Sequence, residues 1–366
     1  MIKAFYTIRT LSLVWLFSSG TVTALSAPAE AQPPAIAAPT AAAVAAETPD
    51  VVEQSHTLAE QNCTIAVYTK DAVPAKVAIA KAFAEMQRIY DKLDASNKHS
   101  ELAAINANAP ADEVIVTEET LGLLQLSLDI CRRSGGAFDP TVSSYDYLWN
   151  FKGKPFVKPL PEEVAARRAI AGCKHVALKL NRAVRLMQPT ARVSFRDLLG
   201  GYAVQRALES LRASGFESMK IVFGNDVYVL GRQGTTRHWY ATLVNPHNAN
   251  DVISQLYLTS HFTATRTDME SFVYKNNKRY CGIVDPRSGQ PVEGVVQATV
   301  IATDPLLADA LSSAVFALGP KAGLALMAKE KNVEGFVIDA AGKVFASPRM
   351  GDFARLPAKI ALEKVN

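Results

Sequence analysis

The sequence predicts an α+β fold, built from mixed sheets with packed helices, and two features of its hydrophobic pattern support that prediction. Segments with alternating, β-branched residues, such as 63–69, occur beside segments with apolar residues at helical spacing, such as 75–94. These segments do not follow the regular strand–helix–strand order of a doubly wound sheet. With 366 residues, of which 49% are hydrophobic, the chain has ample material for a core.

The first half of the folded region is predicted to contain one strand, three helices and a long polar loop. Thr117 is a suitable N-cap, and Pro161 suits the first turn of a helix. The expected elements are a strand at 63–69, helices at 75–94, 117–133 and 161–170, and a polar loop at 95–106.

The second half is predicted to be richer in strands. Turn residues at Asn181-Arg182 and at Gly224-Asn225-Asp226 indicate two hairpins. The remaining expected elements are helices at 200–213, 304–318 and 320–330, strands at 238–245, 254–264 and 296–302, and a closing hairpin at 335–346.

Residues 1–27 have the features of an export signal. Lys3 and Arg9 supply positive charge, and a short apolar stretch from Leu11 to Phe17 precedes small residues that suit cleavage. Because this stretch is short for a membrane span, we expect membrane association only through an uncleaved N-terminus. Residues 28–50, rich in Ala and Pro, are predicted to form a linker, and 51–366 the folded domain. The protein is therefore expected to be periplasmic or otherwise exported.

Charge and cysteine content narrow the function classes. The net charge is only +4, and no dense run of Lys and Arg is present, so we expect no nucleic-acid partner. The four cysteines show no metal-knuckle spacing. Export permits a disulfide, but we predict buried free thiols at Cys63, Cys131, Cys173 and Cys281.

Residues 193–204, VSFRDLLGGYAV, are predicted to run from a strand end through a turn into a helix. Backbone N–H groups at a helix start attract anions, although no lysine is present at this turn. Three other stretches, 135–142, 223–226 and 283–289, each present polar groups but are individually explained by plain turns.

Asp309 and Ser313 are four residues apart on a predicted helix and so share one face. A carboxylate and a hydroxyl on one face are oxygen ligands of the kind that Mg²⁺ prefers. Taken alone, a solvent-facing Asp and a packing Ser explain the pair better than a metal site.

Taken together and in order, these stretches resemble the ApbE-like FAD:protein FMN transferase family. The resemblance extends over roughly residues 55–350. The matching motifs are Ser100-Glu101-Leu102 with Ile105-Asn106, Gly136 to Val142 with Leu148-Trp149 and Phe151, Val193 to Val204, Gly224 to Asp226, Ala264 to Asp268, Gly282 to Gly289, and Ala308 to Ser313.

The resemblance implies an activity and a set of site residues. The family transfers FMN from FAD, its substrate, to a Thr or Ser hydroxyl of a target protein and releases AMP, with Mg²⁺ as cofactor. The implied acceptor is an exported redox protein. Implied metal ligands are Asp309, Ser313 and the backbone carbonyl of Asp197. If the departures described below mean that the site is rewired, the expected base is Asp309 or Asp268. Implied cofactor contacts are Ser96, Ala137, Phe138, Asp139, Ser194, Gly200, Ile283 and Asp285.

Several positions depart from the family pattern. Gly200 replaces a Lys, Ser194 an Asp and Gly282 a His, while Arg266-Thr267 replaces Ser-Gly. If the site is rewired, Arg196 or Arg266 supplies the missing positive charge, because a guanidinium pairs well with phosphate. If catalysis is lost, the chain is a non-catalytic flavin- or partner-binding module. A third hypothesis is an FAD diphosphatase. Retention of Asp309, Ser313 and Asp285 favours the enzyme.

Overall fold

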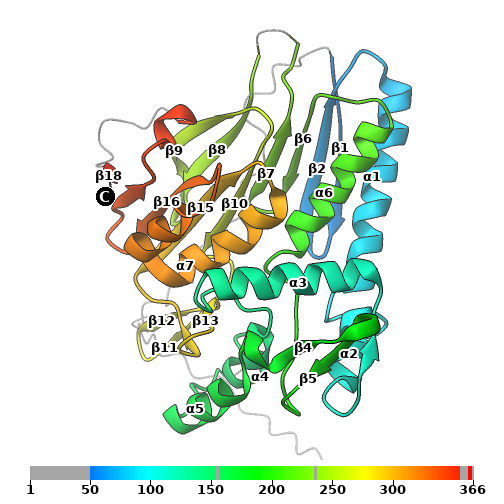
Figure 1. Ribbon diagram of the computed structural model, residues 1–366. Coiled ribbons are helices and arrows are strands. Elements are labelled where there is room, and N and C mark those ends of the chain that lie inside the picture. Colours follow the sequence, from blue (N-terminus) through cyan, green and yellow to red (C-terminus); the bar gives the residue numbers. More distant parts are fainter. Residues whose placement is uncertain (1–49, 154–155, 235–236, 355–361, 365–366) are drawn as a thin grey trace, which may run out of the picture. The chain divides into compact units, whose positions relative to one another are not determined.

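The computed structural model describes residues 50–153, 156–234, 237–354 and 362–364 (Figure 1). The predicted signal and all but the last residue of the predicted linker lie outside these residues. Within them, mixed helices and sheets confirm the α+β prediction.

A nine-stranded sheet forms the centre, in the order β1-β2-β6-β7-β10-β15-β16-β17-β18. All its neighbours pair antiparallel except β17 and β18. The strands are β1 (Val51–Leu58), β2 (Gln61–Tyr68), β6 (Met219–Phe223), β7 (Asp226–Leu230), β10 (His261–Thr267), β15 (Val295–Ala302), β16 (Glu334–Asp339), β17 (Val344–Ala346) and β18 (Leu362–Lys364).

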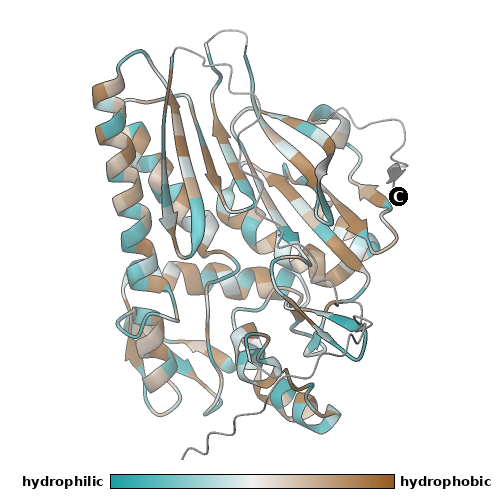
Figure 2. Ribbon diagram, turned by 180° about the vertical axis from the view of Figure 1, so that it is seen from behind, coloured by the Kyte–Doolittle hydropathy of each residue, from teal (hydrophilic) through white to brown (hydrophobic). Residues whose placement is uncertain are grey.

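Three long helices cover one face of this sheet: α1 (Ala72–Leu93), α6 (Leu199–Ala213) and α7 (Pro305–Met327) (Figure 1). The main core fills the space between them and the sheet and includes Ala298 and Val300 of β15. Ile301 points to the opposite face, because successive strand residues alternate, and packs under the hairpin of β8 (Trp239–Asn245) and β9 (Asn248–Leu258). Strand β15 is therefore buried along its whole length, and Figure 2 shows hydrophobic residues along the central strands.

A smaller region lies beyond α3 (Glu118–Arg133), which crosses the ends of α6 and α7 in Figure 1. It contains a three-stranded sheet, two short hairpins and small helices. These are β3 (Val114–Ile115), β4 (Val176–Leu178), β5 (Ala183–Leu186), β11 (Phe272–Lys275), β12 (Lys278–Cys281), β13 (Val284–Asp285), β14 (Gln290–Pro291), α2 (Glu101–Asn108), α4 (Asp146–Trp149) and α5 (Pro161–Ile170), with short 3₁₀ turns at Val142–Tyr145, Cys173–His175 and Leu180–Arg182. Another 3₁₀ turn, Met350–Asp352, belongs to the region of the large sheet, where Met350 packs with residues of β8, β9 and β16.

The structure corrects two sequence predictions and adds a hairpin that was not predicted. Residues 254–264 are not one strand: the chain turns at Ser260, whose φ is 54°, between β9 and β10. The expected polar loop at 95–106 contains helix α2, which Ser100 caps by accepting a hydrogen bond from the Ala103 N–H. The β11–β12 hairpin was not predicted, because each of its strands has only four residues and carries no clear alternation.

Helix α7 is apolar and long enough to cross a membrane by length and composition, and it is the one such helix among the described residues. Its 18-residue apolar window is 67% buried, so it is a core helix of this fold. The helix is interrupted at Gly319, whose φ is 76°, and continues from Pro320, as the two separate predicted helices implied.

Candidate functional site

The stretch that leads into helix α6 is held by two of the motifs identified in the sequence. The side-chain amide of Asn106 donates to the Val193 carbonyl at 2.8 Å and accepts from the Val193 N–H at 2.7 Å. The Ser194 N–H donates to the Pro140 carbonyl at 2.8 Å. These bonds connect residues far apart in the sequence and fix where α6 begins.

The first turn of α6 lies directly against α7. A Cβ on Gly201 would lie 2.4 Å from the Pro305 carbonyl oxygen, so this position requires glycine. The Gly201 N–H donates to Asp309 Oδ2 at 2.8 Å. The anion bound at this helix start is therefore the protein's own carboxylate.

Arg266 completes the surroundings of Asp309. Its Nη2 donates to Asp309 Oδ1 at 2.6 Å, and its Nε donates to Ser313 Oγ at 3.0 Å. The side chain of Arg266 is 14% exposed and that of Asp309 is 1% exposed. Asp309 and Ser313, two of the three expected metal ligands, therefore both contact the Arg266 guanidinium.

Asp226 is a second buried carboxylate beside this pair, at the start of β7. The Thr265 N–H donates to its Oδ1 at 2.7 Å. Burial, and then the nearby Asp309 charge, raise the pKa of Asp226 well above its usual value. Burial also raises the pKa of Asp309, but Arg266 and the Gly201 N–H oppose this. Among the described residues only Asp309 bonds a cationic side chain, so Asp226 is the carboxyl group of this pair that binds a proton more readily.

Tyr90 of α1 borders the same group, although the sequence did not single it out. Burial, followed by the charge of Asp309, raises the pKa of its phenol. Its ring meets that of Phe223 edge-on, with 6.0 Å between centroids. The tyrosine sits among the apolar positions of an amphipathic helix, which gave no signal of a site.

The expected magnesium ligands do not offer a free site. Mg²⁺ requires open oxygen ligands in near-octahedral geometry at about 2.0–2.1 Å. Here Oδ1 and Oδ2 of Asp309 and Oγ of Ser313 each already accept a hydrogen bond. Asp197 is half-buried and near enough for its charge to raise the pKa of Asp309. The residues as arranged here therefore do not fit the metal.

The loop at 135–142, expected to contact flavin, is closed by its own hydrogen bonds. Asp139 Oδ1 accepts from the N–H and Oγ of Thr141, both at 2.7 Å, and Oδ2 accepts from the Cys173 N–H at 2.9 Å. Burial raises the pKa of Asp139. Ala137 and Phe138 are buried in the main core.

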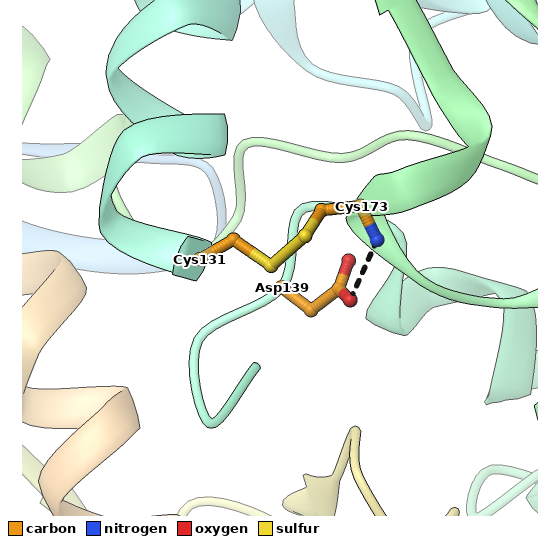
Figure 3. A group of neighbouring side chains, drawn as sticks. All are labelled: Cys131, Asp139 and Cys173. Atoms are coloured by element: carbon orange, nitrogen blue, oxygen red, sulfur yellow. Dashed lines mark hydrogen bonds between the residues drawn. A yellow bond between two sulfur atoms is a disulfide. The ribbon is translucent and has the colours of Figure 1, made fainter. Parts of the chain in front are cut away.

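A disulfide joins Cys131 to Cys173 beside this loop (Figure 3). The prediction of free thiols is therefore wrong for these two cysteines, because the fold brings the end of α3 against residues 172–175. Cys63 and Cys281 are free and buried, as predicted. The two bonded sulfurs and the Asp139 carboxylate lie within 4.8 Å of one another, but a disulfide offers no thiolate ligand.

The turn at 283–289 packs against the stretch that follows this loop. Trp149 Nε1 donates to the Gly289 carbonyl at 2.8 Å. The Asp285 carboxylate binds the guanidinium of Arg287, with both contacts at 2.9 Å. The Ile283 carbonyl accepts from the Val292 N–H at 2.9 Å. The turn is thus satisfied without a ligand.

Asp268, the other expected base, lies in a separate ion-pair group. Its carboxylate bonds Arg279, and His247 Nε2 lies 3.1 Å from its Oδ1. Among the residues that the structure describes, no hydrogen bond or ion pair connects Asp268 to Asp309. His247 was not predicted as a site residue, because an isolated histidine in a hairpin turn carries no motif.

The remaining expected contacts lie at the edge of these groups. Arg196 pairs with Asp146 at 2.8 Å and is half-exposed, so it is not the cation beside Asp309. Ser96 is exposed just after α1, and its N–H donates to Asp94. A Cβ on Gly200 would lie 3.4 Å from Asp309 Oδ2, so a longer side chain there would face Asp309. Gly200 therefore lies beside Asp309, whereas the contacts of Ser194 are with Pro140 and Arg196.

A model of the ApbE family matches residues 59–337. The chain belongs to the ApbE family. A curated relative from Treponema pallidum, named FAD:protein FMN transferase, is 26% identical over 322 residues, which is 82% of this chain and 88% of the relative. A Vibrio cholerae relative of the same name is 25% identical over 245 residues, 66% of this chain and 73% of the relative.

Solved ApbE structures share the fold. The ApbE protein from Thermotoga maritima superposes with a TM-score of 0.77 at 27% identity, covering 83% of this chain and 99% of its own. The apo form of the Pseudomonas stutzeri flavinyl transferase ApbE gives 0.74 at 23% identity, covering 82% and 96%. The expected family and fold are confirmed.

Proposed function

We propose that this protein transfers FMN from FAD to a Thr or Ser hydroxyl of a target protein and releases AMP. The observation that carries the proposal is the family match across residues 59–337, in a fold whose matched relatives are named FAD:protein FMN transferase. Phosphoryl transfer of this kind depends mainly on positioning and on stabilising charge. The Gly201 N–H at the start of α6 and the Arg266 guanidinium both bond Asp309, which brings a cation to this helix start.

The proton of the target hydroxyl needs an acceptor, and we assign this role to His247 held by Asp268. Their contact of 3.1 Å orients the imidazole, and the histidine is half-exposed, so it can meet a protein substrate. Asp309 is less suitable because Arg266 and Gly201 occupy both its oxygens. Gly282 cannot hold the family's histidine, since a Cβ there would lie 2.5 Å from the Ser271 Cβ.

We propose no Mg²⁺ ion in this reaction, because the side chains expected to bind it, Asp309 and Ser313, already accept hydrogen bonds from Gly201 and Arg266.

We propose an exported location and an exported redox protein as acceptor. The positively charged, then apolar N-terminus supports this location. The Cys131–Cys173 disulfide also supports it, since such bonds persist in oxidising compartments.

A second candidate is a flavin-binding protein that does not catalyse transfer. The closed position of Gly282 and the neutralisation of Arg266 by Asp309 favour it. Such a protein would bind FAD and leave it intact.

The test incubates the purified protein with FAD and an acceptor that a transferase relative modifies, with that relative as positive control. In-gel flavin fluorescence reports transfer, chromatography reports AMP, and calorimetry reports FAD binding. We expect transfer and AMP, both lost in His247→Gln, while FAD binding persists. Binding without AMP supports the second candidate, and no binding contradicts both.

A further inference from the structure

A single guanidinium occupies the place between the two side chains expected to hold the metal. Arg266 Nη2 lies 2.6 Å from Asp309 Oδ1, and Nε lies 3.0 Å from Ser313 Oγ. Asp309 and Ser313 are one turn apart on α7, so both side chains converge from one helix face. The planar fork of arginine matches this spacing.

The fold holds Arg266 in this position. It lies on β10, where Arg266 is paired with Ala298 of the fully buried strand β15. The backbone therefore cannot move away without breaking the middle of the sheet. The buried guanidinium is held on its other side by Asp309, whose Oδ1 lies 2.6 Å from Nη2, and an arginine keeps its charge in proteins.

A buried carboxylate needs a compensating charge, and Asp309 is almost fully buried. The family resemblance implies that a divalent metal ion supplies the compensating charge. In this chain the arginine, which replaces the serine of the family pattern, supplies it from within the protein.

Arg266 keeps donors for a ligand. Its Nε and Nη2 bind Ser313 and Asp309, while Nη1 has no hydrogen-bond partner among the residues that the structure describes. Two N–H groups are thus left for an external acceptor such as a phosphate oxygen.

We propose that Arg266 is a built-in cation in the position expected for Mg²⁺, and that the Asp309–Ser313 site acts without a divalent metal. We also propose that Nη1 of Arg266 binds the diphosphate of FAD, and this second statement rests on the proposed function.

The first experiment measures metal binding alone, with Mn²⁺ as probe, by electron paramagnetic resonance. We expect no saturable binding to this site in the wild type. Arg266→Ser removes the guanidinium and should gain Mn²⁺ affinity by about tenfold or more over the wild type. Mg²⁺ should raise the Tm of Arg266→Ser but not of the wild type, because a ligand stabilises the state that binds it. The matched control, Arg266→Ser with Asp309→Asn, should lose both effects.

Arg266→Lys covers the case in which Arg266→Ser does not fold, because it keeps the charge beside Asp309. This variant should also exclude Mn²⁺. Saturable Mn²⁺ binding by the wild type that Asp309→Asn removes would overturn the proposal, and so would a folded Arg266→Ser that binds no more Mn²⁺ than the wild type.

The second experiment titrates FAD into the wild type with EDTA and with Mg²⁺. Affinities within about twofold of each other are expected, and a loss of about tenfold or more with EDTA would overturn the metal-independent site. If FAD does not bind under either condition, the proposed function fails, while the Mn²⁺ experiment still decides the role of Arg266.

Discussion

Asp139 and Asp309 are both buried carboxylates in motifs that match the family, yet their partners differ in kind. Asp139 accepts hydrogen bonds only from neutral groups, those of Thr141 and Cys173. Asp309 accepts one from the Gly201 N–H and a charged one from Arg266. Hydrogen bonds with neutral groups therefore account for the burial of Asp139. Asp309, on α7, is instead held by an ion pair with Arg266 of β10 and by a hydrogen bond from Gly201 of α6.

The comparison shows that a retained residue can keep its place while its partner changes. The motif around Asp139 forms the tight turn that its sequence predicts, and the hydrogen bonds of Asp139 lie within that turn and with Cys173. The motif around Asp309 is retained on α7, but β10 now presents an arginine to it. Retention of a carboxylate alone therefore does not indicate which cation it binds.

The largest expected difference between the two carboxylates comes from Asp309→Ala compared with Asp139→Ala. Asp309→Ala leaves the buried Arg266 unpaired and should lower the free energy of unfolding by about 3–5 kcal/mol, although a helix by itself tolerates alanine. Asp139→Ala leaves neutral donors unpaired and should cost about 1–3 kcal/mol. Urea unfolding of both variants checks this. Equal losses of unfolding free energy in the two variants would contradict the expected difference between the two carboxylates.

The disulfide beside Asp139 should give the next largest effect. Cys131→Ser with Cys173→Ser releases a cross-link between residues 42 apart and should lower the free energy of unfolding by about 2–4 kcal/mol. Dithiothreitol should destabilise the wild type similarly and leave the double variant unchanged. A wild type with the same Tm in both redox states would show that the bond adds nothing to this loop.

A smaller, pH-dependent effect should come from Asp226, the buried carboxyl group beside Asp309. Its folded pKa is raised, so the native state binds the proton more tightly than the unfolded state. Stability should therefore fall as the pH rises from about 4, the ordinary pKa of Asp, toward the folded pKa. Asp226→Asn removes this loss, so the variant should gain stability relative to the wild type between about pH 5 and pH 7.5. Urea unfolding at both values measures it, and a constant difference would place the proton elsewhere.

The smallest effect is expected from Gly200→Lys compared with Gly200→Met. Both side chains would face Asp309 and Phe223, but only Lys adds charge. Because Arg266 already compensates Asp309, the two variants should differ in FAD affinity by less than about threefold, that is, less than about 1 kcal/mol. In an Arg266→Ser background, Lys should bind FAD more tightly than Met. A tenfold gain for Lys with Arg266 present would indicate a site that simply lacks its lysine.

The sequence by itself determined the elements whose signals are local. Helical spacing gave α1, α3, α6 and α7, and the interruption at Gly319-Pro320 was visible in the residues themselves. Turn residues gave the β6–β7 and β4–β5 hairpins. The ordered motifs also gave the family, because their order survives even where single residues change.

Only the tertiary structure decided the partners of these residues. The sequence offered Arg196 and Arg266 equally as the compensating cation, and it left Cys131 unpaired. Strand pairing of β10 with β15 brings Arg266 under α7, and the end of α3 brings Cys131 to Cys173. Local propensities act over a few residues, whereas charge compensation and cross-linking depend on which distant segments the packed sheet and helices place within about 3 Å of one another.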